Sequence, residues 1–118
     1  MPKLTPRPFF SAVDGFKSGK DTPSAFLERC LATFDELEPQ VLAFVHYDKE
    51  RARRDAAAAT ARWREGKPLS PIDGMPVGVK DIIETQDMPT EIVAALYKGY
   101  RSNRDAASVA ALREAGAV

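Results

Sequence analysis

A lysine stands inside an apolar segment that two glycines and two prolines interrupt. The segment reads Pro71-Ile-Asp-Gly-Met-Pro-Val-Gly-Val-Lys80-Asp81. In a strand over residues 75–81, side chains alternate between faces, so Gly78 and Lys80 share a face and Asp81 points away. A lysine near a protein core loses hydration, which lowers its pKa and favours the neutral amine. Because a neutral amine can take a proton from a hydroxyl, the segment indicates a candidate general base at Lys80.

Two interpretations of Lys80 remain open on this pattern alone. Gly78 has no side chain, so another chain segment or a ligand could approach the backbone beside the ammonium group. The plainer interpretation is a lysine at the end of a strand with its charged head in water. Periodicity alone favours the plainer interpretation.

The helices expected around this segment are marked by capping residues and by apolar residues at helical spacing. Thr22 and Pro23 begin a helix that Pro39 is expected to end. Asp105 is the expected cap of the last helix. The other predicted helices cover residues 11–17, 48–65 and 105–115.

Of two short apolar segments, residues 41–47 are predicted as a strand or extended segment and residues 75–81 as a strand. Ala117 and Val118 follow the last helix and a glycine, an order that usually leads into a strand of an α/β unit. We therefore expect an α/β fold with helices packed on an incomplete, mixed sheet. Residues 1–118 are expected to be the N-terminal part of a single domain.

The composition excludes several classes of protein. Lys plus Arg and Asp plus Glu number 17 each, so the net charge is zero and gives no general attraction to nucleic acid or to an anionic membrane. No apolar run is long enough to span a bilayer, and the first residues lack the apolar core of a signal peptide. A cytoplasmic protein is expected, with no metal and no nucleotide cofactor, because the sequence has neither a ligand cluster nor a glycine-rich phosphate loop.

The single cysteine and the single histidine both have structural interpretations. Cys30 lies on the expected buried stripe of its helix, as a small core residue, and can form no internal disulfide. His46 has no carboxylate or thiol at ligand spacing, which favours a structural role. The arginines of residues 51–64 alternate with acidic residues and indicate a solvated helix face.

The lysine segment also resembles a known family. Asp73-Gly-Met-Pro-Val-Gly-Val-Lys80-Asp81 is similar to the lysine motif of amidase signature hydrolases. Ile82-Ile-Glu-Thr-Gln-Asp-Met-Pro-Thr90 resembles the family's next loop, and residues 97–117 resemble the helix after it. The upstream helix, strand and alanine-rich helix follow the family's order, so the resemblance covers nearly the whole chain.

The resemblance implies a serine nucleophile, a bridging serine in a cis peptide, and a lysine that acts as general base through the bridging serine. Lys80 would be that lysine. The implied reaction is hydrolysis of a small-molecule carboxylic amide through an acyl-enzyme, or transfer of the amide nitrogen in some members. A positioned base is what makes a hydroxyl an effective nucleophile.

The sequence departs from the family in two places. The Gly- and Ser-rich stretch that carries both serines lies beyond the lysine in the family, and this sequence stops before it. No nucleophile is therefore assigned among the chain's own serines, which are Ser11, Ser18, Ser24, Ser70, Ser102 and Ser108. The family commonly has Gly-Ser shortly after the Pro-Thr of its loop, whereas Pro89 and Thr90 are followed here by Glu91-Ile-Val-Ala-Ala95.

Two functions are compatible with the sequence. In the first, the chain is an N-terminal fragment of an amidase with a Ser-Ser-Lys mechanism, inactive alone because two of three catalytic groups are absent. In the second, it is a non-catalytic interaction protein derived from an amidase. Its uncovered strand edges and apolar helix faces would then be buried by self-association or by a complementing chain. The sequence leaves open the amide substrate and the choice between a hydrolase and an amidotransferase parent.

Overall fold

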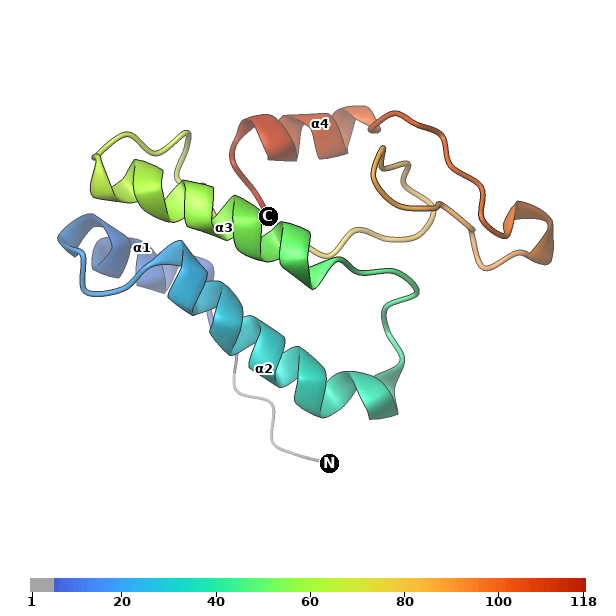
Figure 1. Cartoon of the computed structure of the whole chain (residues 1–118), viewed down its shortest axis with the longest axis horizontal. Coiled ribbons are helices and arrows are strands. Elements are labelled where there is room, and N and C mark those ends of the chain that lie inside the picture. Colours follow the sequence, from blue (N-terminus) through green and yellow to red (C-terminus); the bar gives the residue numbers. More distant parts are fainter. Residues whose placement is uncertain (1–5) are drawn as a thin grey trace.

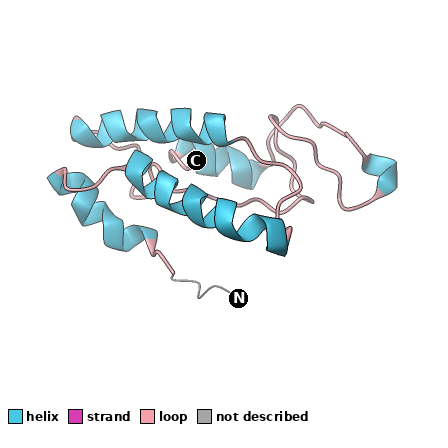
Figure 2. Ribbon diagram, turned by 60° about the horizontal axis from the view of Figure 1, so that its bottom comes forward, coloured by secondary structure: helices cyan, strands magenta, loops and turns pink. Residues whose placement is uncertain are grey.

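A computed structural model describes residues 6–118, which form helices joined by loops. In chain order the elements are α1 (Phe9–Ser18), α2 (Pro23–Val41), α3 (Lys49–Arg64), the 3₁₀ helix η1 (Ala95–Tyr97) and α4 (Ala107–Glu114) (Figure 1). The described residues contain no strand (Figure 2). None of the helices within residues 6–118 is both long enough and apolar enough to cross a membrane.

The start of α2 confirms the prediction, but its end does not. The Thr22 hydroxyl accepts a hydrogen bond from the Ala25 N–H at 3.1 Å, and Pro23 is the first helical residue. The predicted end at Pro39 is wrong, because the helix continues to Val41 and is closed by Leu42 in the left-handed region, at φ 51°. A proline in the last turn removes only one intrahelical hydrogen bond, which α2 tolerates.

Helix α3 presents small residues to α2, and the two lie side by side (Figure 1). Asp48 caps α3 by accepting from the Arg51 N–H at 2.9 Å. The Ser24 and Thr60 hydroxyl oxygens are 2.9 Å apart across the contact. The buried residues of α3 are Ala56, Ala59, Thr60 and Trp63.

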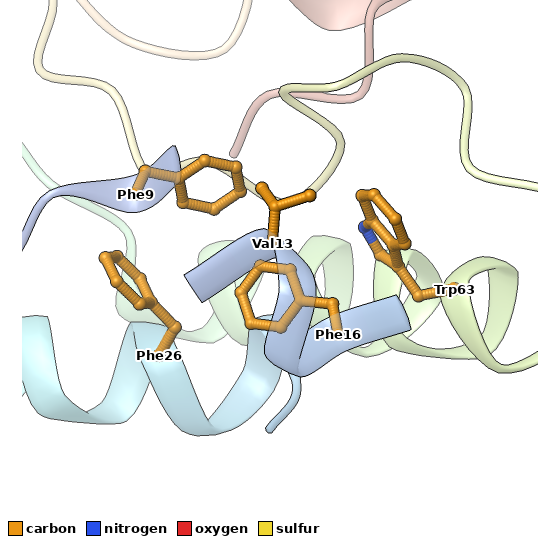
Figure 3. Close-up of a cluster of buried hydrophobic side chains, with 5 residues drawn as sticks. All are labelled: Phe9, Val13, Phe16, Phe26 and Trp63. Carbon is orange, nitrogen blue, oxygen red and sulfur yellow. The ribbon is translucent and has the colours of Figure 1, made fainter. Parts of the chain in front are cut away.

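The hydrophobic core joins the first three helices (Figure 3). Phe9, Val13 and Phe16 of α1 pack against Phe26 of α2 and Trp63 of α3. The ring centroids of Phe9 and Phe26 are 5.3 Å apart, and those of Phe16 and Trp63 are 5.8 Å apart. Aromatic rings contribute large buried areas, so this cluster fixes how α1 sits on α2 and α3.

The expected strand over residues 75–81 is an extended segment with the beginning of a strand pair. The N–H of Gly74 donates to the Gly116 carbonyl, the N–H of Val118 to the Met75 carbonyl, and the N–H of Val77 to the Val118 carbonyl, each at 2.8 Å. This alternation between two segments that run in the same direction is that of a parallel pair. The expected mixed sheet is not shown, since residues 6–118 contain no strand.

Two other predictions about elements are wrong. Val41 ends α2, and residues 42–47 are a loop instead of a strand, because Leu42 turns the backbone into the left-handed region. Asp105 does not cap α4, whose N-cap is Ala106 without a side-chain bond. The Asp105 carboxylate instead accepts from the Gln86 N–H at 2.8 Å and from Arg113 Nε at 2.8 Å. The Asp105 carboxylate therefore joins the loop that contains Gln86 to α4.

Candidate active site

The segment that carries Lys80 is anchored at its start by a buried carboxylate, Asp73, which has no exposed surface. Arg62 of α3 donates from Nε to Asp73 Oδ2 at 2.8 Å and from Nη2 to Oδ1 at 2.6 Å. These bonds raise the pKa of Arg62. The indole N–H of Trp63 donates to the Asp73 carbonyl at 2.9 Å. The segment therefore starts from a point fixed to α3 and to the core.

Gly74 lets the segment pass close to the helices. Its φ of +89° suits glycine. A side chain there would place its Cβ 2.6 Å from Pro23 Cβ and 3.1 Å from Ala59 Cβ. Only glycine fits this crossing over the start of α2 and the middle of α3.

Lys80 itself is exposed, and no ion pair within residues 6–118 includes its ammonium group. The described residues therefore do not bury the Lys80 side chain. The segment positions the backbone of Lys80 but does not enclose its side chain.

Another segment of the chain, which carries Phe44, packs beside the backbone of Gly78. A Cβ built on Gly78 would lie 3.7 Å from Cε1 of Phe44. The Phe44 ring packs on Phe34 of α2, with centroids 5.3 Å apart, and Phe34 packs in turn on Tyr47, at 4.8 Å. Residues 41–47 thus form the aromatic side of the site, which confirms that a chain segment can approach at Gly78.

Asp81 is a site residue that sequence reasoning missed, beyond placing its side chain away from Lys80. Its Oδ1 accepts from the Glu91 N–H at 3.0 Å, and its carbonyl accepts from the Ile92 N–H at 3.1 Å. The Lys80 carbonyl accepts from the Ile83 N–H at 2.9 Å and closes a turn. The residue after the lysine therefore joins this turn to the loop that departs from the family pattern.

His46 and Glu91 connect the aromatic side of the site to the same loop. His46 Nε2 lies 3.1 Å from Glu91 Oε2, a pair 45 residues apart in sequence. The other oxygen, Glu91 Oε1, accepts from the Gly99 N–H at 2.6 Å. The Gly99 N–H, with a further contribution from His46, holds the pKa of Glu91 below its ordinary value. His46 thus contacts a carboxylate that local spacing does not reveal.

Two serines and the single cysteine have structural surroundings. Ser24 bonds Thr60, and Ser70 donates to the Ala115 carbonyl at 2.7 Å, so both hydroxyls have structural partners. Burial raises the pKa of the half-buried Cys30 thiol. The part of the chain that the structure describes has no group of three or more potential metal ligands. A hollow of about 490 Å³ lies beside the start of α3, and Lys80 is not among its lining residues.

Comparisons with known proteins agree on one family. The family model described as Amidase matches residues 25–118. A glutamyl-tRNA(Gln) amidotransferase subunit of Chloroflexus aggregans is 40% identical over 108 residues, which cover 92% of this chain and 22% of that protein. The corresponding protein of Leptospira interrogans is 32% identical over 116 residues, covering 98% and 24%.

Solved structures share the arrangement of the elements. A chain from a vestigial protein complex related to an s-triazine catabolic enzyme superposes with a TM-score of 0.86 at 28% identity, covering 95% of this chain and 25% of its own. The peptide amidase of Stenotrophomonas maltophilia has a TM-score of 0.76 at 28% identity, covering 93% and 23%. The chain thus spans about a quarter of the length of the proteins it matches.

Proposed function

Because this chain belongs to the amidase family, we propose that it is the N-terminal part of an amidase domain and supplies the catalytic lysine, Lys80, for hydrolysis of carboxylic amides. The observation that carries the proposal is the position of Lys80. It follows an extended segment anchored by Asp73 and by the parallel pairing with residues 116–118. A base on such a support can be held in one geometry.

The proposed mechanism needs groups that residues 1–118 do not contain. The neutral Lys80 amine would take a proton from a bridging serine, which would take one from the nucleophilic serine as this attacks the amide carbonyl. The acyl-enzyme would form as the carbon–nitrogen bond breaks, and the leaving nitrogen would take the proton that Lys80 had received, relayed back through the bridging serine. Water would then attack the acyl-enzyme and give one proton to the same relay, and the acid would be released as the nucleophilic serine regains that proton. The rest of the amidase domain would also bury Lys80, lower its pKa and complete the mixed sheet. The rest of the domain would come from a continuation of this polypeptide or from a complementing chain. We also propose a cytoplasmic location for the protein.

A second candidate function is a non-catalytic interaction protein that self-associates or binds a partner. Exposed apolar side chains favour it, because contiguous exposed patches mark binding surfaces. Val93, shortly before η1, is 90% exposed, and Leu96, within η1, is 89% exposed. The loop of residues 42–47 adds Leu42, which is 79% exposed. In an amidase fragment the same surfaces would be covered by the rest of the domain.

The rate of amide hydrolysis, measured on two proteins, distinguishes the catalytic function from the non-catalytic interaction function. One is the 118-residue chain, and the other is a chimera in which this chain replaces the matching 23% of the S. maltophilia peptide amidase. The substrate is a peptide amide, with native peptide amidase as the positive control. We expect that the 118-residue chain does not hydrolyse the peptide amide and that the chimera does. A chimera that unfolds cooperatively on heating but has no activity would contradict the catalytic proposal and favour the interaction protein.

A further inference from the structure

Two buried oxygens close to Lys80 have no hydrogen-bond partner. They are Asp81 Oδ2 and Thr90 Oγ1, and they are the two buried side-chain atoms of this kind within residues 6–118. Thr90 is 2% exposed. Folded proteins rarely leave buried polar atoms unpaired, since each loses its bonds to water without compensation. Both atoms are covered by the described residues, so a donor from elsewhere reaches them only where the side chains that cover them move aside.

The two oxygens belong to one small cluster. Asp81 Oδ1 holds the N–H of Glu91, the residue after Thr90, at 3.0 Å. The Thr90 N–H donates to the Tyr100 carbonyl at 2.9 Å. The main chain around both side chains is thus fixed, and the unpaired atoms remain at a defined place on the loop beside the Lys80 turn.

The loop that Asp81 holds is strained. Ile92 and Val93 have φ values of 55° and 53°. These are β-branched residues, for which the left-handed region is a genuine outlier. Such a backbone persists only where surrounding contacts impose it. The hydrogen bond from the Ile92 N–H to the Asp81 carbonyl, at 3.1 Å, is one of these contacts.

Resting on the proposed function of Lys80, we propose that Asp81 is a positioning residue for it. Asp81 Oδ1 locks the backbone that carries the lysine to residues 90–93. When the remaining part of the amidase domain packs on this loop, the side chains that cover Asp81 Oδ2 and the Thr90 hydroxyl move aside, and the two oxygens gain a donor group from that part. Together these bonds set the reach of the Lys80 amine toward the serine it deprotonates. An error of about 1 Å in such a geometry costs roughly a hundredfold in rate.

The first test is amide hydrogen exchange in the 118-residue chain, with Trp63 emission as the check of folding. Asp81→Ala removes the acceptor, so exchange at Glu91 should quicken by about tenfold to a hundredfold. Asp81→Asn keeps an oxygen at the Oδ1 position, so exchange there should stay close to that of the original chain. Asp105→Asn is the matched control, because Asp105 also holds a loop N–H, that of Gln86. It should leave Glu91 unchanged. If the chain does not fold alone, the same amides are followed in the chimera.

The second test is turnover of a peptide amide by the chimera, where Oδ2 is engaged. Asp81→Asn replaces that acceptor with a donor and should lower kcat about tenfold or more with KM unchanged. Asp105→Asn should leave kcat unchanged. Unaltered kcat in Asp81→Asn and Asp81→Ala, or an equal loss in Asp105→Asn, would overturn the proposal. A folded but inactive chimera would contradict the function of Lys80 alone, while the exchange comparison still decides whether Asp81 holds the loop.

Discussion

The fully buried Asp73 carboxylate and the Arg62 guanidinium form a bidentate ion pair, with Nε–Oδ2 and Nη2–Oδ1 distances of 2.8 and 2.6 Å. The pair joins α3 to the start of the Lys80 segment. The backbone N–H of Leu69 adds a third bond, to Oδ2 at 2.9 Å. All the donors face the carboxylate, so its charge is compensated although it has no exposed surface.

Asp73→Asn should lower the free energy of unfolding by about 3 kcal/mol, because it leaves the Arg62 charge facing an amide N–H₂. Urea unfolding followed by the emission of Trp63, the single tryptophan, measures the change. Asp14→Asn is the control, since the Asp14 side chain is 94% exposed in its pair with Lys17. Its effect should stay below about 0.5 kcal/mol. Equal effects of the two variants would contradict a structural role for Asp73.

Gly116→Ala should destabilise the chain more than Gly66→Ala. Both glycines have positive φ, +90° and +68°, so alanine costs about 1 kcal/mol at each from the backbone alone. A Cβ on Gly116 would also lie 2.8 Å from Asp73 Cγ, whereas one on Gly66 meets nothing within 4 Å. We expect a further loss of about 1–3 kcal/mol at Gly116 from this overlap. Equal losses in urea unfolding would show that Gly116 does not pack on Asp73.

Stability should fall in acid partly through Glu91. Its pKa in the fold lies below the ordinary value of 4.5. The unfolded chain therefore binds more protons as the pH falls, so the stabilisation present above about pH 4.5 is lost as pH drops through the folded pKa. Glu91→Gln removes this contribution. The stability difference between the original chain and Glu91→Gln should shrink between about pH 6 and pH 3. A difference that stays constant would contradict the bonds from Gly99 and His46.

Cys30 should react slowly with an alkylating reagent near pH 8. Burial raises the pKa of the thiol, so the folded chain holds less of the reactive thiolate than the unfolded chain does. Mass spectrometry of the alkylated product, with and without urea, should show reaction several-fold slower without urea. Equal rates would mean that Cys30 is not packed beside α1 as the structure shows.

The features that were predicted correctly are governed by neighbouring residues. The Thr22 hydroxyl caps α2 through the Ala25 N–H, three residues later. Pro23 is the first helical residue, as its fixed φ favours. Such signals lie within one turn of chain and can be recognised in the sequence.

The features that sequence reasoning missed depend on distant partners. Asp105 has a cap-like position but bonds Gln86 and Arg113 instead. The pairing of His46 with Glu91 joins residues 45 positions apart. The expected strand 41–47 has no ladder partner within residues 6–118, so its apolar residues became a loop that packs on α2. Tertiary contacts decided each case, and no local pattern encodes them.

The most direct test of the account is the peptide-amide turnover of the chimera with Lys80→Ala. The control is Lys98→Ala, which changes another exposed lysine near the same loop. We predict that Lys80→Ala lowers kcat by about a thousandfold or more, since the general base is lost, while Lys98→Ala leaves it within about twofold. Turnover that survives Lys80→Ala, or an equal loss in Lys98→Ala, would contradict Lys80 as the catalytic lysine.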